Sequence, residues 1–439
     1  MPKRIAVIGG GFTGLVAAYE LGKRGCQVAL FERGDYLGGL ASGFAIEDHP
    51  LEKAYHHLFT TDSAMLALVH ELGLDFELIM CADSKALYHA GRLYPFTTPF
   101  DLLHFTPLSF FNRLRFGFVT LYLTHAPNWQ RFIPIPAAAW LKKWYGAQAY
   151  AIVWEPLLKG KFHNHYTDVS MAWLWARINS RGNSKDQGRE RVIYFRHGFA
   201  VVVKALTRKL KELGVDIKYQ TQITAVTSST VPTITFTDGT SESFDRIICT
   251  TPSHVFARLI ETDAHASEEY LAQLNSINYL GAVLIIFSSS QSLSKYFWHN
   301  LNDPASPFLV FLQHTNLVDP AWYNGKHIYY LGAYLSHEHA FFRNSDQEVA
   351  SEGFDYIKKL FPSFKKEAVR QMQVFRFPNA QHIVDTDYTK KIPDYKTPLP
   401  GIYLANFSQI FPEDRGTNFA VREGIKIAKL VCADLRPLL

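Results

Sequence analysis

Residues 4–32 read RIAVIGGGFTGLVAAYELGKRGCQVALFE, and this stretch decides the fold. Its first six residues form a short β-branched run that suits a buried parallel strand. A GxGxxG fingerprint at residues 9–14 then opens a segment with apolar residues at helical spacing. The last six residues form a second strand that ends on Glu32. The stretch therefore predicts a strand–helix–strand unit of the Rossmann type that binds a dinucleotide.

Each residue of the fingerprint has a separate task in such a unit. Gly9 allows the tight turn, Gly11 lets the backbone approach a pyrophosphate, and Gly14 lets the helix pack on the strand. The helix N-terminus stabilises the phosphate charge. Glu32 lies where a carboxylate binds ribose hydroxyls, which argues against NADP. Arg33 follows it, but a single arginine is a weak sign of a 2′-phosphate partner.

The composition excludes several classes of protein. A chain of 439 residues with 47% hydrophobic and 19% charged residues predicts two or three packed substructures. A net charge of +5 is small for a nucleic-acid-binding protein, although it leaves attraction to anionic substrates or lipid surfaces open. No signal peptide or spanning segment is expected, which indicates the cytoplasm. Scattered cysteines without a CxxC pair argue against disulfides and zinc: Cys26, Cys81, Cys249 and Cys432.

A second glycine pair follows in the stretch ERGDYLGGLASGF, residues 32–44. The fingerprint, the acid and then Gly38-Gly39 resemble the FAD superfamily of amine oxidases, protoporphyrinogen oxidases, phytoene desaturases and UDP-galactopyranose mutases. The resemblance implies FAD, with the glycine pair close to its phosphates and ribityl chain. Leu40 stands where most members carry a basic residue, as in some desaturase-like members, which argues against a true amine oxidase.

The same resemblance implies two more FAD-binding segments. In the family a backbone contact to adenine comes from the position of Val226; a core valine is the alternative. Asn406 replaces the usual acid after the last strand and can still bind a ribityl or phosphate oxygen. A final helix starts near Thr417 and Asn418, either of which can cap it, and points its N-terminus at the flavin. Residues 413–415 either form a solvated loop or line the flavin site.

The predicted fold is α/β. The resemblance implies a Rossmann-like FAD-binding domain assembled from three chain segments, with an inserted helical cap and a mixed-sheet substrate domain. The FAD-binding segments are 1–80, 191–260 and 395–439, the cap is 81–190 and the substrate sheet is 261–394.

The cap is rich in aromatic residues and proline, and two interpretations stay open. In the first, the aromatics form only the core of the cap. In the second, the cap also docks on the inner face of the membrane and admits an amphiphilic substrate. The second interpretation rests on basic residues among the aromatics: Arg113, Arg115, Arg131, Lys142 and Lys143.

Residues 52–62, EKAYHHLFTTD, contain two adjacent histidines. A metal site is not expected, because adjacent residues on a strand point to opposite faces and no further ligands have suitable spacing. The stretch is similar to the H-x-F-x-T segment of the mutases, which implies that His57 lies beside the flavin and tunes its potential or transfers a proton. The alternative is two histidines that bind the backbone. By family position, Arg376, Gln381 and Tyr388 either approach the flavin from the substrate side or are structural.

The leading hypothesis is an FAD-dependent oxidoreductase that passes hydride from a small organic substrate to flavin N5, with His57 and Arg376 as catalytic residues. One alternative is a non-redox, UDP-galactopyranose mutase-like flavoenzyme that holds a sugar diphosphate. Another is a binding protein of the same fold, as in Rab GDP-dissociation inhibitors. Candidate arginines for the mutase are Arg177, Arg181, Arg189, Arg191 and Arg376. The expected FAD contacts are Gly9, Gly11, Phe12, Thr13, Gly14, Glu32, Arg33, Gly38, Gly39, Leu40, Val226, Asn406, Thr417, Asn418 and Phe419.

Overall fold

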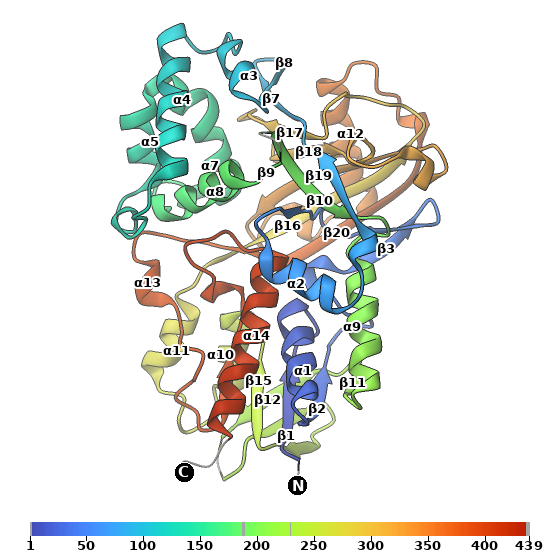
Figure 1. Cartoon of the computed structure of the whole chain (residues 1–439), viewed down its shortest axis with the longest axis vertical. Helices are drawn as coiled ribbons and strands as arrows, with labels where there is room; N and C mark the ends of the chain where they lie inside the picture. The colour runs from blue at the N-terminus through green and yellow to red at the C-terminus, as the bar shows by residue number, and fades with distance from the viewer. Residues whose placement is uncertain (1, 187–188, 229, 436–439) are drawn as a thin grey trace.

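A five-stranded parallel sheet forms one layer of the molecule, with strand order β11-β2-β1-β15-β21 (Figure 1). The computed structural model describes residues 2–186, 189–228 and 230–435. β1 pairs in parallel with β2 and with β15, so strands from remote parts of the chain lie side by side. The strands are β1 (Arg4–Ile8), β2 (Gln27–Phe31), β11 (Asp216–Lys218), β15 (Arg246–Cys249) and β21 (Ile402–Leu404).

Both faces of this sheet are covered because successive side chains of a strand point to opposite sides. Ile5 and Val7 join one hydrophobic cluster with three helices, whereas Ala6 and Ile8 join a second cluster on the other face. The first face is covered by α1 (Phe12–Lys23), α9 (Ala200–Glu212) and α14 (Thr417–Asp434). The second is covered by β12 (Ile223–Thr227), β13 (Thr233–Phe236), β14 (Ser241–Ser243), α10 (Ser253–Ile260) and α11 (Glu268–Asn275).

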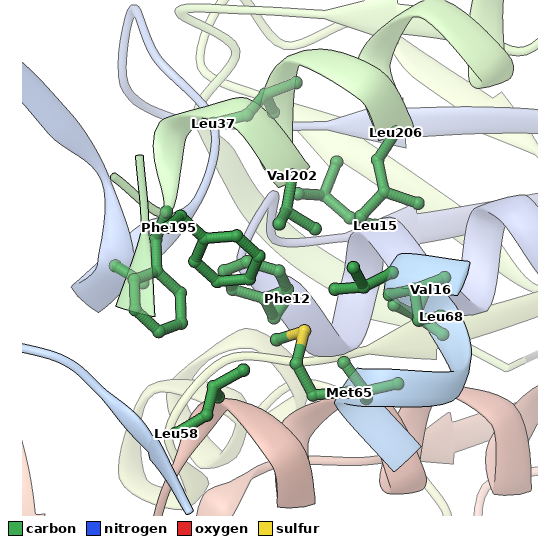
Figure 2. Packing of buried hydrophobic residues seen from close by; sticks show 14 of the residues in the cluster. Phe12, Leu15, Val16, Leu37, Leu58, Met65, Leu68, Phe195, Val202 and Leu206 are labelled. Atoms are coloured by element: carbon green, nitrogen blue, oxygen red, sulfur yellow. The ribbon is translucent and has the colours of Figure 1, made fainter. Parts of the chain in front are cut away.

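Helix α1 is buried along nearly its whole length. At Gly424 of α14, an added Cβ would lie only 2.8 Å from the Thr13 carbonyl oxygen, so glycine lets these two helices pack closely. The small sheet β5-β10-β6 and helix α2 (Ser63–Glu71) complete the cover. Figure 2 shows how α1 packs against these neighbours through Phe12, Leu15, Val16, Met65, Leu68, Phe195, Val202 and Leu206.

A seven-stranded sheet forms the second large layer, with strand order β20-β16-β19-β18-β17-β7-β8. Its neighbouring strands are antiparallel except for the parallel pair β17 and β7. Helix α12 (Asp346–Leu360) packs against it. The strands are β7 (Lys85–His89), β8 (Arg92–Pro95), β16 (Tyr279–Ser289), β17 (Trp298–Leu301), β18 (Val310–Gln313), β19 (His327–Leu335) and β20 (Val369–His382).

A helical unit forms the upper left of the view in Figure 1, away from both chain ends. Its core is aromatic, as the edge-to-face pair of Phe162 and Trp173 with ring centroids 4.8 Å apart illustrates. In the described ranges no helix is both long and apolar enough to cross a membrane. The helices are α3 (Pro99–Leu103), α4 (Phe110–His125), α5 (Ala137–Tyr145), α6 (Ala147–Ala149), α7 (Glu155–Phe162) and α8 (Met171–Asn183), and α13 (Tyr388–Lys391) lies beyond them.

Short strands link these layers. β3 and β4 form a hairpin, and β10 pairs with β5, β6 and β9. Residues before and after the helical unit are thus joined in one small sheet next to α1. The short strands are β3 (Gly43–Ile46), β4 (His49–Glu52), β5 (Leu58–Phe59), β6 (Leu78–Ala82), β9 (Lys185–Asp186) and β10 (Arg189–Phe195).

Candidate active site

The turn between β1 and α1 requires glycine at two positions and leaves open space at a third. Gly9 has φ +107°, a conformation that side chains rarely adopt. A Cβ at Gly14 would lie 1.9 Å from the Gly9 carbonyl oxygen, so the helix could not pack on the strand. A Cβ at Gly11 would meet no atom within 4 Å. The backbone at Gly11 and the first N–H groups of α1, at Phe12 and Thr13, therefore face space that a ligand can enter.

The second glycine pair lies directly against the first turn. The Gly38 N–H donates to the Gly10 carbonyl oxygen at 2.8 Å, and a Cβ at Gly39 would lie 3.2 Å from the Gly11 Cα. Gly38 and Gly39 have φ values of +105° and +57°. The two glycine motifs thus form one backbone surface without side chains, as a bound diphosphate requires.

Glu32 closes this surface. Its carboxylate accepts hydrogen bonds from the N–H groups of Gly10 at 2.8 Å and Gly34 at 2.7 Å. Arg33, next to it, is exposed. Val226 is fully buried, in the cluster on the opposite face of the sheet, and pairs with Ile234 in the ladder between β12 and β13.

A cavity, partly open to solvent, lies where the glycine-rich layer, the seven-stranded sheet and the helical unit meet. Leu40, just after the second glycine pair, forms part of its wall. Other parts of the wall come from residues 54–62, from α7 and α8, and from strands β16 to β19. The aromatic and histidine residues of the wall are Tyr55, His56, His57, Phe59, Trp298, Tyr334, Phe377 and Phe419.

The N-terminus of α14 opens into this cavity. Gly416 precedes the helix, no side chain caps it and its first turn carries no acidic residue. Gly416, Thr417, Asn418 and Phe419 all line the cavity, so the N–H groups of this turn present partial positive charge there. The expectation that Thr417 or Asn418 caps α14 is wrong. The Asn418 side chain instead accepts hydrogen bonds from the N–H groups of Ala64 and Met65, in the first turn of α2.

One carboxylate joins two cations in the cavity wall. The Asp414 Oδ2 atom lies 2.7 Å from Lys161 Nζ and 2.7 Å from Arg177 Nη1. Burial favours the neutral acid, but Lys161, Arg177 and Arg415 outweigh it and hold the pKa of Asp414 well below its usual range. Burial also lowers the pKa of Lys161, and Asp414 opposes that shift. The open choice for residues 413–415 is therefore decided for Asp414 and Arg415, which line the cavity.

Tyr334 lies beside this ion cluster. Its hydroxyl oxygen accepts a hydrogen bond from Arg415 Nη2 at 2.9 Å, and its hydroxyl is also hydrogen-bonded to Tyr55. Burial opposes ionisation of the phenol, but the charges of Arg415 and Lys161 lower the pKa of Tyr334 below its usual value. Tyr55 shifts the other way, because burial and the neighbouring Tyr334 raise its pKa. The two phenols thus differ in acidity although they touch.

Both histidines of the HH pair line the cavity. His56 Nδ1 donates to the Ala54 carbonyl oxygen at 2.6 Å. Burial lowers the pKa of His56 to about 4 and that of His57 to about 3. His57 packs edge-on against Phe59 and Trp298, with ring centroids 5.2 and 6.2 Å away. Both imidazoles are therefore neutral at pH 7.

Two other predicted residues, Arg376 and Asn406, lie outside the cavity wall. Arg376 binds the Phe341 and Asn344 carbonyl oxygens and the Asp346 carboxylate, on the side of β20 where α12 begins. Its neighbour Phe377 lines the cavity instead, because adjacent strand residues face opposite sides. Asn406 is buried and caps the short turn Phe407–Gln409.

Two residues expected to be either site or structural make buried structural contacts. The Gln381 Nε2 atom donates to the His382 carbonyl oxygen. The Tyr388 hydroxyl donates to the Ser408 carbonyl oxygen. Neither residue lines the cavity.

Sequence reasoning missed Lys161, Tyr55 and Tyr334. Lys161 could have been found from its spacing to Leu157. Residues four apart share a helix face, and a lysine on the same face as an apolar residue is unusual. Tyr334 could have been found from the strand pattern of HIYYLGAYLS, because Gly332 and Tyr334 lie two residues apart and share one face of the strand. Of the arginines considered for a diphosphate, Arg177 and Arg181 line the cavity, and Arg191 and Arg376 do not. The side chain of Arg189 lies outside the described part of the structure.

Comparison with protein families decides the family. The sequence model described as flavin containing amine oxidoreductase matches residues 12–431. The chain belongs to this family. Family membership implies a flavin cofactor and a small-molecule substrate, and the side-chain-free glycine surface that leads toward an aromatic cavity fits such a group.

Relatives of this flavin-containing amine oxidoreductase are distant in sequence. A coproporphyrinogen III oxidase from Staphylococcus aureus is 23% identical over 319 residues, which are 65% of this chain and 67% of the relative. A structure titled putative protoporphyrinogen oxidase, from Exiguobacterium, has a TM-score of 0.78 at 16% identity and covers 99% of each chain. A structure of reduced UDP-galactopyranose mutase has a TM-score of 0.77 at 18% identity, over 98% of this chain and 96% of that chain. These similarities show the mixed α/β fold.

Proposed function

We propose that this flavin-containing amine oxidoreductase is an FAD-dependent enzyme that takes hydride from an organic substrate held in the cavity. The observation that most directly supports this proposal is the backbone surface that the two glycine motifs form between Gly9 and Gly39. This surface leads to Leu40 in the cavity wall. When bound, FAD supplies the hydride acceptor. The binding domain is proposed to combine segments 1–80, 191–260 and 395–439, since the strands of the parallel sheet come from all three.

The chain's own groups account for each part of a dinucleotide. The N–H groups at Gly11, Phe12 and Thr13 would hold the diphosphate, and Glu32 would exchange its loop contacts for ribose hydroxyls. The backbone of Val226 would contact adenine. The N-terminal turn of α14 would stabilise negative charge at the ring system that enters the cavity.

Tyr334, and not a histidine, is proposed to accept the proton that a substrate loses with its hydride. His56 and His57 have pKa values of about 4 and 3, which makes them weak bases. Tyr334 lines the cavity, accepts from Arg415 at 2.9 Å and has a lowered pKa because burial is outweighed by the cations beside it. His57 is proposed to position the ring system through its aromatic contacts.

A non-redox mutase is the second candidate, and the charge of the cavity favours it. Four cations line the wall against two carboxylates, which suits an anionic group such as a sugar diphosphate. These residues are Lys161, Arg177, Arg181, Arg415, Asp62 and Asp414. The structure titled reduced UDP-galactopyranose mutase has the same fold.

Anaerobic absorbance spectroscopy of the purified protein separates the candidates. Release of the cofactor by heat and chromatography against FAD and FMN standards tests the cofactor. An oxidoreductase substrate bleaches the flavin band without added reductant. Turnover of UDP-galactopyranose only after reduction by dithionite, with no net electron flow, supports the mutase. A colourless protein that takes up no FAD contradicts both and leaves a binding protein of this fold.

A further inference from the structure

Helix α4 presents apolar side chains to solvent as well as to the core. Only Phe116 and Leu123 are buried among its 16 residues. Phe111 is 80% exposed and Phe118 is 70% exposed, and Tyr122, four residues further on, is 49% exposed. These three residues share one face because positions four and seven apart lie together on a helix. Helix α4 is therefore apolar on its solvent side in addition to the side that packs on the core.

Neighbouring helices extend this surface. Of the fourteen large hydrophobic side chains exposed in the described residues, eight come from residues 100–144. Monomeric proteins rarely expose so many apolar residues together unless the surface binds a partner or a membrane. We name these eight residues the aromatic face: Phe100, Leu103, Phe110, Phe111, Phe118, Leu121, Tyr122 and Trp144.

The aromatic face is also strongly basic. Between Pro99 and Tyr145 the chain has five arginines and lysines and one acid, Asp101, so this segment has a net charge of +4 out of +5 for the whole chain. Among the described residues no carboxylate forms an ion pair with these cations. Two of them donate to backbone carbonyl oxygens, which leaves their charge in place. The cations are Arg113, Arg115, Arg131, Lys142 and Lys143.

The other side of the helical unit forms the cavity wall. Helix α4 packs against α8, and α8 carries Arg177 and Ser180 into the cavity. Figure 1 shows the unit at the end of the molecule opposite both chain termini, with α7 and α8 toward the sheets. The aromatic face is therefore one helix layer away from the cavity.

We propose that the aromatic face docks on an anionic lipid surface. Aromatic side chains, among them Trp144 and Tyr122, enter the interface of a bilayer while lysines and arginines bind lipid headgroups. A second copy of this chain is disfavoured as the partner, because two faces of net charge +4 would repel each other. Docking would place the cavity near the membrane, where an amphiphilic substrate resides. This inference goes beyond the proposed redox chemistry.

Vesicle co-sedimentation tests the proposal with the whole protein. We expect binding to phosphatidylcholine vesicles that contain 30% phosphatidylglycerol, weak binding to pure phosphatidylcholine, and loss of binding at high salt. The double variant Phe111→Ser/Phe118→Ser should bind at least about tenfold more weakly. Lys142→Gln/Lys143→Gln should lose about 25-fold, at roughly fivefold per charge.

Matched variants elsewhere on the surface serve as controls. Phe76→Ser removes an aromatic that is 67% exposed, and Lys295→Gln/Lys365→Gln removes two exposed lysines. Both should bind as the unaltered protein does, and all variants should keep its thermal midpoint. Equal weakening in controls and test variants overturns the proposal. So does a concentration-dependent dimer that Phe111→Ser/Phe118→Ser dissociates while vesicles bind nothing.

Discussion

A methyl group added at Gly14 would clash with the backbone, whereas one added at Gly11 would not. Substitutions at these two positions therefore distinguish a glycine needed for folding from a glycine needed for ligand binding. The Gly14 position is closed by a backbone oxygen at 1.9 Å, whereas the Gly11 position faces open space. Gly11 has φ −72°, which alanine adopts without strain. The Gly11 position is therefore free of a folding constraint, and only a ligand would need the absence of a side chain there.

We predict that Gly11→Ala leaves the thermal midpoint nearly unchanged but lowers flavin occupancy at least about tenfold, because its methyl group occupies the proposed diphosphate position. Gly14→Ala should lower the midpoint and the yield of folded protein. Differential scanning fluorimetry and flavin absorbance measure both effects. Gly117→Ala, where the new Cβ has only an ordinary contact at 3.7 Å, is the control. Full flavin occupancy in Gly11→Ala would place the cofactor elsewhere.

A second prediction concerns Tyr334. Because its phenolate is the proposed proton acceptor, flavin reduction should become faster as pH rises through its lowered pKa. Tyr334→Phe should slow reduction about 100-fold or more and remove this pH dependence. Stopped-flow absorbance with saturating substrate measures the rate. Tyr356→Phe, which lies outside the cavity wall, should keep the profile, and an unchanged profile in Tyr334→Phe assigns the proton to another group.

At the residue scale, the sequence indicated some site residues and misplaced others. The resemblance to the mutase segment predicted His57 beside the flavin, and His57 lies in the cavity wall. The face of Arg376 could not be predicted from alternation alone. The ladder between β16 and β20 shifts register between Leu280 and Ala282, next to the stretch that follows Arg376. The pairing of Lys161 with Asp414 depends on tertiary contacts across the chain, which no local pattern encodes.

The first turns of α14 and α2 are joined by the hydrogen bonds of one side chain. Asn418, in the first turn of α14, accepts from the N–H groups of Ala64 at 2.9 Å and Met65 at 3.1 Å. Asp62, which precedes α2, forms no side-chain cap there. The start of α2 is therefore satisfied by a residue from the other end of the chain, and both helix starts meet at the cavity.

We predict that Asn418→Ala lowers the free energy of unfolding by about 1–2 kcal/mol, since two buried N–H groups lose their acceptor. Asn418→Asp keeps an acceptor oxygen and should recover most of the loss. Urea denaturation followed by circular dichroism measures the change. Asn128→Ala, at an exposed position, is the control, and equal stability of Asn418→Ala and the unaltered protein would show that water replaces the cap.

Element prediction succeeded where the pattern is local. The strand and helix limits predicted within residues 4–32 agree with β1, α1 and β2. In this stretch the hydrophobic periodicity is clear and glycines mark the ends of the elements. Which apolar residues of α4 lie outward could not be predicted, because this helix is apolar on both its core side and its solvent side.

At the scale of the whole molecule, buried titratable groups make stability depend on pH. Burial lowers the pKa of His299 to about 4 and of His314 and His382 to about 3, in addition to His56 and His57. A histidine with a lowered folded-state pKa binds more protons when unfolded, so stability falls as pH drops below about 6.5. Burial raises the pKa of Glu52 to about 7 and of Asp62 to about 6, which opposes this trend.

Burial also lowers the pKa of His254 to about 4. We predict a net uptake of about four protons per molecule on unfolding at pH 5, from about six histidines less about two acids. The free energy of unfolding should therefore decrease from pH 6.5 to pH 4. Calorimetry in buffers of different ionisation enthalpy measures the uptake directly. Release of protons at pH 5, or a stability that does not change over this range, would contradict the assignment of neutral buried histidines.

Neighbouring strands of the parallel sheet come from remote parts of the chain, and this affects folding during synthesis on the ribosome. β1 and β2 emerge first, but β15, which pairs with β1, begins only at Arg246, and β21, which pairs with β15, begins only at Ile402. At roughly 5–20 residues per second, the nascent chain exposes the apolar sides of α1 for about 20–80 s before α14 arrives to cover them. During that interval chaperones have access to the first helix. Because we propose that the N-terminus of α14 belongs to the flavin site, we expect complete cofactor binding only after translation has passed residue 417.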